Sequence, residues 1–192
     1  SQKNGELELV AGITAIHNVS SNTPHAQLAT NRHSDIDLEA STTKQVTLSR
    51  WQKLNISATG MSIRRHPTAE KNIKIGGILG IKSKDEQNWS IGIVRWASCG
   101  NRDRLDIGVQ LIAPQAQSAI AKIDGREHNE MVLLLQEILA TNQPATIIAP
   151  RGTFEPARSL TLTYNDTHQH IMLTKLIERS NHFEQIQYSV IN

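Results

Sequence analysis

The chain has 192 residues, of which 38% are hydrophobic and 20% are charged, and these fractions are ordinary for a soluble globular protein of one or two domains. The net charge of +2, without any long run of like charges, argues against nucleic-acid binding. Cys99 is the single cysteine, which excludes an internal disulfide and favours a reducing cytoplasm. No apolar run is long enough for a transmembrane helix, and the start, SQKNGELELV, is unlike a signal peptide. We therefore expect a cytoplasmic protein without membrane insertion.

The first half of the chain predicts strands interrupted by one long polar segment. Residues 6–16 alternate and then become apolar, which predicts a first strand. Residues 17–44 are rich in Ser, Thr, Asn and Asp, and their apolar residues follow neither the two-residue period of a strand nor the 3.6-residue period of a helix. We therefore expect a loop or disordered insertion with at most a short helical patch. Strand patterns then return at 46–65, 72–82, 89–97 and 104–112, with polar turns between them. Strands at this spacing predict an antiparallel barrel or sandwich.

The second half predicts a further, smaller β unit. Residues 115–125 form an Ala-rich connector of helical character, and residues 131–139 fit the helical and the strand period equally well. Strand patterns follow at 145–149, 158–164, 170–178 and 182–190, separated by Pro, Gly and Asn-Asp turns. The predicted fold class is therefore all-β, with a β-barrel domain at 1–114 and a smaller β-barrel-like domain at 115–192.

A polar turn flanked by cations lies at the centre of the first unit. Asn55, Ser57 and Gly60 form an N-x-S-x-x-G pattern between two alternating segments. Asn and Ser side chains hydrogen-bond to backbone or to a ligand edge, and Gly permits a bend that other residues resist. Arg50, Arg64 and Arg65 flank this turn and are candidates to hold an anion.

The turn and the strands after it resemble the PilZ domain family. The N-I-S-A-T-G element at 55–60 looks like the (D/N)-x-S-x-x-G signature of these domains, and W-S-I-G-I-V-R-W at 89–96 and D-I-G-V-Q-L at 106–111 stand where the family has its later strands. The resemblance covers about residues 6–114. It implies a six-stranded β-barrel that binds the bacterial second messenger cyclic di-GMP and signals to a protein partner.

The resemblance also implies which residues would contact such a ligand. Guanine offers its O6 and N7 acceptors to a guanidinium fork, and arginine also stacks on bases and neutralises phosphate. The implied site for cyclic di-GMP comprises Asn55, Ser57, Gly60, Arg50, Arg64 and Arg65, with no cofactor and no metal.

One family feature is absent from the sequence. PilZ domains that bind this ligand carry an R-x-x-x-R pair before the signature, whereas no two arginines of this chain stand four residues apart. Two interpretations follow. Either the pair precedes Ser1 in a longer protein, or the domain is degenerate, binds no nucleotide and acts as a protein-interaction or assembly module. Arg50, Arg64 and Arg65 offer a partial substitute for the missing pair.

The remaining chemistry-bearing residues predict no enzyme. The three tryptophans, Trp51, Trp89 and Trp96, are expected in the core because the chain has few aromatic residues. His168 and His170 share a strand face, but neither a Cys nor an acidic partner accompanies them, which makes a poor metal site. No nucleophile–base set, Walker motif or dinucleotide motif occurs.

Overall fold

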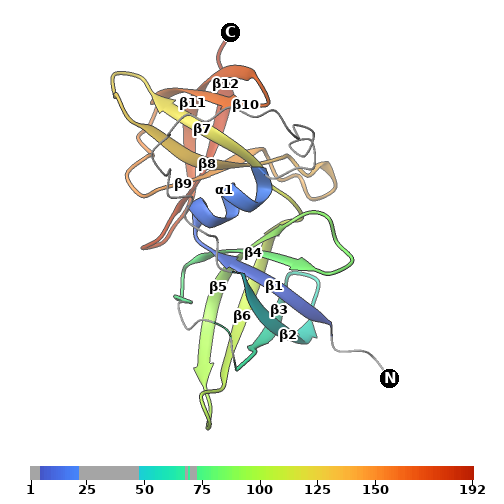
Figure 1. Cartoon of the computed structure of the whole chain (residues 1–192). Helices are drawn as coiled ribbons and strands as arrows, with labels where there is room; N and C mark the ends of the chain where they lie inside the picture. Colours follow the sequence, from blue (N-terminus) through green and yellow to red (C-terminus); the bar gives the residue numbers. More distant parts are fainter. Residues whose placement is uncertain (1–4, 22–47, 68, 70–72) are drawn as a thin grey trace, which may run out of the picture.

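The computed structural model describes residues 5–21, 48–67, 69 and 73–192, which fold into two closed antiparallel β-barrels (Figure 1). Most of the predicted polar insertion at 17–44 therefore lies outside the described residues. The all-β class and the succession of two barrels are confirmed. None of the described helices is both long and apolar enough to cross a bilayer.

The first barrel closes in the order β1-β2-β3-β6-β5-β4. Its strands are β1 (Glu6–Ala11), β2 (Ser49–Ile56), β3 (Gly60–Arg65), β4 (Ile78–Ser83), β5 (Ser90–Cys99) and β6 (Leu105–Ala113). Period-two alternation places one side-chain set inside, where Trp51, Ile63 and Ile107 are almost fully buried. The opposite set faces outward, and on β2, β3, β5 and β6 that outer face carries the candidate site.

The second barrel closes in the order β10-β11-β12-β9-β8-β7. Its strands are β7 (Gln117–Ile123), β8 (Asn129–Leu135), β9 (Thr146–Ala149), β10 (Ser159–Tyr164), β11 (Thr167–Arg179) and β12 (Glu184–Val190), and a short 3₁₀ turn, η2 (Leu139–Thr141), links β8 to β9. Glu184 is 1% exposed and accepts hydrogen bonds from the N–H groups of Gly152 and Phe154 and from the Arg179 guanidinium. Burial alone raises the pKa of this carboxyl, but those hydrogen bonds outweigh it and the pKa lies below the ordinary value.

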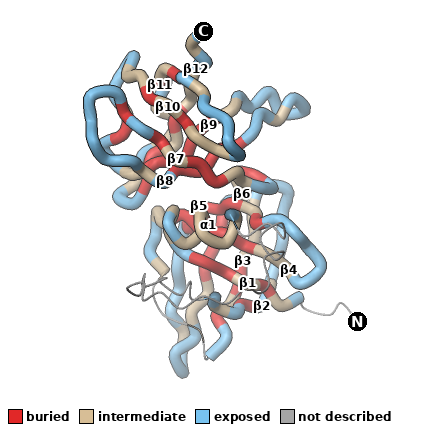
Figure 2. Tube along the Cα trace, turned by 45° about the horizontal axis from the view of Figure 1, so that its top comes forward, coloured by how far each residue is buried: buried red, intermediate tan, exposed pale blue. Residues whose placement is uncertain are grey.

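The two barrels share a third apolar cluster, in which Ile91, Ile93 and Trp89 of the first barrel meet Leu133 and Phe183 of the second. In Figure 2 buried residues line the strands of both barrels and continue where they meet, while the hairpin loops are exposed. Because this cluster is as buried as the barrel interiors, we infer that the two barrels form one packed unit.

Helix α1 (Ile13–Ser21) lies against this junction, beside β7 and β8 and above β4 in Figure 1. Gly12 has a φ of +91°, a conformation suited to glycine, and it ends the strand pattern of β1. From there Ile13, Ile16 and Val19 recur every third residue and form one apolar stripe, with Ile16 fully buried. Ser118 on β7 donates a hydrogen bond to the His17 carbonyl, 2.8 Å away, which fixes the helix to the second barrel.

Three sequence predictions need correction. The predicted strand at 6–16 ends at Ala11, because the change from period two to period three at Gly12 begins a helix. Residues 17–21, predicted to begin the loop insertion, belong to that helix. The Ala-rich connector at 115–125 contains strand β7, whose Ala119, Ala121 and Ile123 alternate into the barrel core. The ambiguous segment at 131–139 is a strand as far as Leu135.

The partial burial of His17 on α1 predicts that the stability of the fold is sensitive to acid. Burial lowers the pKa of its imidazole below the ordinary 6.5, although a hydrogen bond with the Ala119 backbone opposes this shift. Below pH 6.5, His17 therefore binds a proton more readily in the unfolded chain than in the folded one. Its contribution leaves the free energy of unfolding unchanged above pH 6.5 and lowers it as the pH drops below that value.

We therefore expect the free energy of unfolding to fall more steeply in the wild type than in a His17→Leu variant between about pH 6.5 and pH 5.5. Urea unfolding followed by circular dichroism measures both slopes. The other histidines are common to both proteins and cancel in the comparison. Parallel slopes would show that His17 keeps its ordinary pKa in the fold.

Candidate functional site

A row of outward-facing residues crosses four neighbouring strands of the first barrel. The register pairs Asn55 on β2 with Ser62 on β3, Ser62 with Gly108 on β6, and Gly108 with Trp96 on β5. Neighbours in sequence such as Ile63 point into the core, so the row lies on the outer face. The N-x-S-x-x-G turn therefore lies beside the later strands, which are far from it in sequence.

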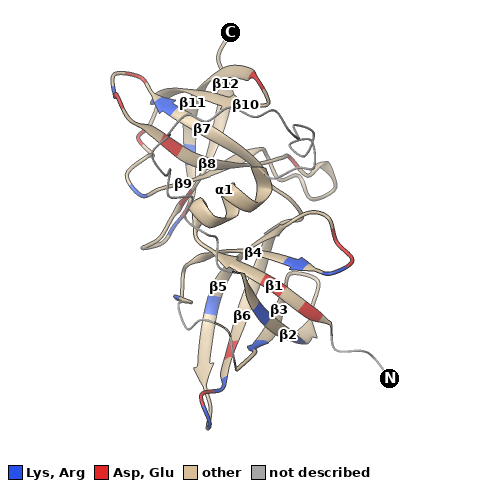
Figure 3. Cartoon of the chain, in the orientation of Figure 1, with Lys and Arg blue, Asp and Glu red and all other residues tan. Residues whose placement is uncertain are grey.

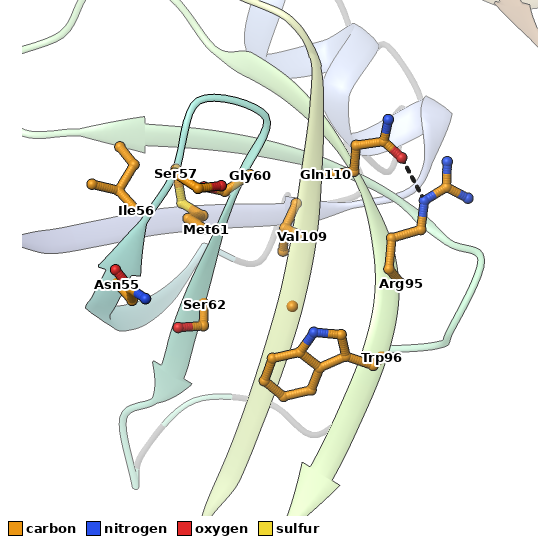
Figure 4. Close-up of a pocket in the computed structure, with 11 residues that line it drawn as sticks. Asn55, Ile56, Ser57, Gly60, Met61, Ser62, Arg95, Trp96, Val109 and Gln110 are labelled. Carbon is orange, nitrogen blue, oxygen red and sulfur yellow. Dashed lines mark hydrogen bonds between the residues drawn. The ribbon is translucent and has the colours of Figure 1, made fainter.

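A β-bulge brings Trp96 to this face. Strict alternation from the buried Val94 would send Trp96 into the barrel interior, but the register with β6 shifts between these two residues and Arg95 is the extra residue. Trp96 is consequently 46% exposed. A Cβ atom on Gly108 would lie 1.9 Å from the Trp96 Nε1, so the indole can lie across β6 only because residue 108 has no side chain (Figure 4).

The signature turn is held by its own hydrogen bonds. The Ser57 N–H and hydroxyl both donate to the Gly60 carbonyl, at 2.8 and 3.1 Å. The Leu111 N–H donates to the Thr59 carbonyl at 3.0 Å and joins the turn to β6. A Cβ atom on Gly60 would lie 2.5 Å from the Val109 carbonyl oxygen. Glycine is therefore required here because β3 approaches the backbone of β6 closely.

These elements enclose an open pocket of about 350 Å³. Its lining comes from β2, β3, β5, β6 and the turn: Asn55, Ile56, Ser57, Gly60, Met61, Ser62, Arg95, Trp96, Gly108, Val109 and Gln110. The Asn55 amide makes no hydrogen bond to any other residue that the structure describes. Among the described residues of this lining, Arg95 is the only one with a charged side chain. The pocket therefore offers an aromatic face, an available amide and one cation.

Arg95 is held at the pocket edge by two partners. Its Nε donates to the Gln110 side-chain oxygen at 2.7 Å, and its two terminal nitrogens donate to the Glu178 carboxylate at 2.5 and 3.0 Å. The hydrogen bond to Glu178, which lies on β11 of the second barrel, raises the pKa of Arg95 above its ordinary value. The guanidinium points toward Gln110 and away from Trp96 in Figure 4.

The structure brings Asn55, Ser57 and Gly60 together around the pocket, and it places the three flanking arginines outside the pocket lining. Arg64 forms a bidentate ion pair with Asp106, at 2.8 and 2.9 Å. Arg65 points to the opposite side of β3, is 6% exposed and donates to the Asp103 carbonyl. Arg50 is largely exposed, with its Nε 3.7 Å from the Glu6 carboxylate.

The expectation that every tryptophan packs in the core holds for Trp51 and Trp89 and is wrong for Trp96. Sequence reasoning missed Trp96, Arg95 and Gln110 as pocket residues. A usable signal was the glycine of D-I-G-V-Q-L, since a glycine in a strand interior often marks a place where another group approaches closely. The bulge at Arg95 carries no comparable signal in the sequence.

The described residues outside the pocket offer little other chemistry. They contain no group of three His, Cys, Asp or Glu side chains arranged to hold a metal ion. His170 lies 3.1 Å from the Asp124 carboxylate, and His168 is 2.9 Å from the Thr163 hydroxyl. In the view of Figure 3, basic and acidic residues of the described part of the chain are interspersed along the strands and loops of both barrels.

Comparisons with known proteins match both barrels. The family described as "Cyclic-di-GMP receptor FimW, middle PilZ domain" matches residues 18–118, and the "FimW C-terminal beta-barrel domain" matches residues 116–191. The cyclic-di-GMP receptor FimW of Pseudomonas aeruginosa is 26% identical over 139 residues, which cover 70% of this chain and 23% of that protein. The aligned part is thus less than a quarter of that relative's length. No solved structure matches. The names of the matching family and of this relative describe a receptor and not an enzyme.

Proposed function

Since the chain belongs to the family of the FimW middle PilZ domain, followed by the FimW C-terminal β-barrel, we propose that its outer-face pocket binds cyclic di-GMP. The observation that carries this proposal is the exposed Trp96 indole, which lies across Gly108 next to the signature turn. The two-barrel unit would act as a regulatory module and not as an enzyme.

The lining of the pocket suits a guanine nucleotide. An exposed indole offers a flat face on which a base stacks, an interaction worth about 1–3 kcal/mol per base. The Asn55 amide has a donor and an acceptor available for the edge of the base. The Gln110 side chain stands on the opposite side of the pocket and already accepts from Arg95, which leaves its amide N–H groups for the ligand.

The signature residues would have unequal roles in this site. Asn55 would contact the ligand directly, because its amide makes no hydrogen bond to another described residue. Ser57 and Gly60 would shape the turn, since their groups are engaged with each other and with β6. Arg50, Arg64 and Arg65, which the resemblance implied as ligand contacts, have ion-pair or backbone partners within the barrel, and we assign them no direct contact.

We further propose that the module acts in the bacterial cytoplasm and passes ligand binding to a protein partner. An exposed thiol at Cys99 is compatible with a reducing compartment. The packed junction between the barrels supports a signalling role, because it gives a ligand on the first barrel a route to the second. The alternative, an interaction module that binds no nucleotide, predicts the opposite result in the experiment below.

Isothermal titration of the chain with cyclic di-GMP tests the proposal. We expect saturable binding, and we expect Asn55→Ala to weaken it about tenfold because a hydrogen bond to the base is lost. Asn101→Ala, which changes an exposed Asn in the β5–β6 turn, is the matched control and should bind as the wild type does. Absence of heat at ligand concentrations on the order of tens of micromolar would contradict the proposal.

A further inference from the structure

The pocket on the first barrel adjoins a cleft between the barrels. This cleft, of about 240 Å³, is lined by Gln110 and its neighbours on β6 and by Glu178, Ile177 and Gln185 of the second barrel. Gln110 lines both the pocket and the cleft. The Arg95–Glu178 ion pair therefore stands at the boundary between the proposed ligand site and the second barrel.

We propose that Arg95 is the phosphate-binding cation of this site and that Glu178 of the second barrel is its counter-ion in the absence of ligand, so that ligand and Glu178 compete for one guanidinium. This inference rests on the proposed function and adds to it a residue, a competitor and a direction of regulation. The R-x-x-x-R pair is absent from the sequence, and Arg95 would supply a guanidinium for the phosphate in its place.

The geometry permits the exchange. Arg95 uses its two terminal nitrogens as a fork on the Glu178 carboxylate, and the same fork fits two oxygens of a phosphate. Its side chain is 39% exposed and that of Glu178 is 27% exposed, so water screens the pair and its net stabilisation is small. The long side chain of Arg95 already lines the pocket and can turn toward it by rotation about its own bonds.

Competition links ligand binding to the contact between the barrels. If a phosphate takes the guanidinium, Glu178 loses its partner and the first barrel loses this polar contact with β11. Linkage requires the reciprocal effect, namely that the Glu178 contact weakens ligand binding by the same factor. Ligand would therefore loosen this edge of the junction, while the apolar cluster around Ile91 and Phe183 keeps the barrels together.

Titration of the full chain and its variants with cyclic di-GMP tests this competition. Glu178→Gln removes the competing charge and should bind about threefold more tightly than the wild type, the factor expected when a partly exposed ion pair no longer opposes binding. Arg95→Gln should bind about tenfold more weakly. Glu155→Gln, which makes the same charge change at an exposed carboxylate paired with Arg158, should leave affinity unchanged.

The double variant Arg95→Gln/Glu178→Gln separates competition from simple repulsion of an anionic ligand. Competition predicts that it binds like Arg95→Gln alone, because Glu178 acts only through Arg95. If the wild type binds and Glu178→Gln binds with equal or weaker affinity, the competition is overturned while the proposed function stands. The same holds if the gain in affinity from Glu178→Gln persists in the double variant. Failure of the wild type and of every variant to bind would overturn both.

Discussion

Replacing Gly60 with alanine is expected to lower the free energy of unfolding by about 2–3 kcal/mol, the cost of forcing an extra carbon into a close-packed place. The new Cβ atom would lie 2.5 Å from the Val109 carbonyl oxygen and 3.5 Å from the Gln110 Cα. These are backbone atoms of β6, which cannot turn away as a side chain can, so the pairing of β3 with β6 must loosen. Urea unfolding followed by circular dichroism measures the loss.

Gly5→Ala is the matched control for this experiment. A Cβ atom at Gly5 would meet nothing within 4 Å, and this residue precedes β1 in an exposed position. Its unfolding free energy should therefore match that of the wild type. Equal stabilities of Gly60→Ala and the control would mean that β3 and β6 do not approach each other closely. The expected loss makes the signature glycine a requirement of the barrel itself, so the signature is strong evidence for the fold whether or not a ligand binds.

Replacing Gly108 with alanine is expected to reduce affinity for cyclic di-GMP by about tenfold or more while leaving the barrel folded. The new methyl group would lie 1.9 Å from the Trp96 Nε1 and 2.2 Å from its Cε2, so the indole must leave its position across β6. Because the ring is already 46% exposed, it can move into solvent at little cost to stability. The stacking face would then be lost although the tryptophan itself remains.

Titration calorimetry with Gly108→Ala, Trp96→Ala and the double variant measures this effect. Both single variants should lose a similar factor, and the double variant should lose no more than either, because both changes remove the same interaction. Gly5→Ala again serves as the control. Binding of Gly108→Ala at wild-type affinity would show that the position of the indole does not matter to the ligand.

The sequence predicted the barrels well where alternation is regular. The signature turn, its place between two strands and the later strands of the first barrel follow from period two and turn residues alone. Strand β7 was not predicted as a strand, because Ala119 and Ala121 occupy its core-facing positions and alanine has the highest helix propensity. Helix α1 was not predicted, because its apolar stripe begins directly after β1 and Gly12 alone stands between the two elements.

The candidate site was only half predictable. Asn55, Ser57 and Gly60 form a local motif, and local motifs are visible in a sequence. Arg64 and Arg65 looked like a pair of cations, yet adjacent residues of a strand point to opposite faces, and one is held on the outer face while the other is nearly buried. The predicted strand alone would have placed Arg64 and Arg65 on opposite faces of the sheet.

Trp96 and Arg95 were not predictable in the same way. Both owe their positions to a single bulge, which depends on the register between β5 and β6 and therefore on contacts distant in sequence. Glu178 reaches Arg95 from another barrel, 83 residues further along the chain. Pairing of this kind is fixed by tertiary packing, which the local pattern of either segment does not specify.

The indole N–H signals of the isotopically labelled protein show whether cyclic di-GMP stacks on Trp96 beside the signature turn. The chain has three tryptophans, and Trp96→Phe assigns the signal in question. Trp51 is 1% exposed and its indole donates to Ser49 at 2.9 Å, so its signal should stay fixed. We predict that the Trp96 signal moves saturably as ligand is added. An unchanged Trp96 signal at ligand concentrations that saturate the protein calorimetrically would show that the ligand does not stack on this indole.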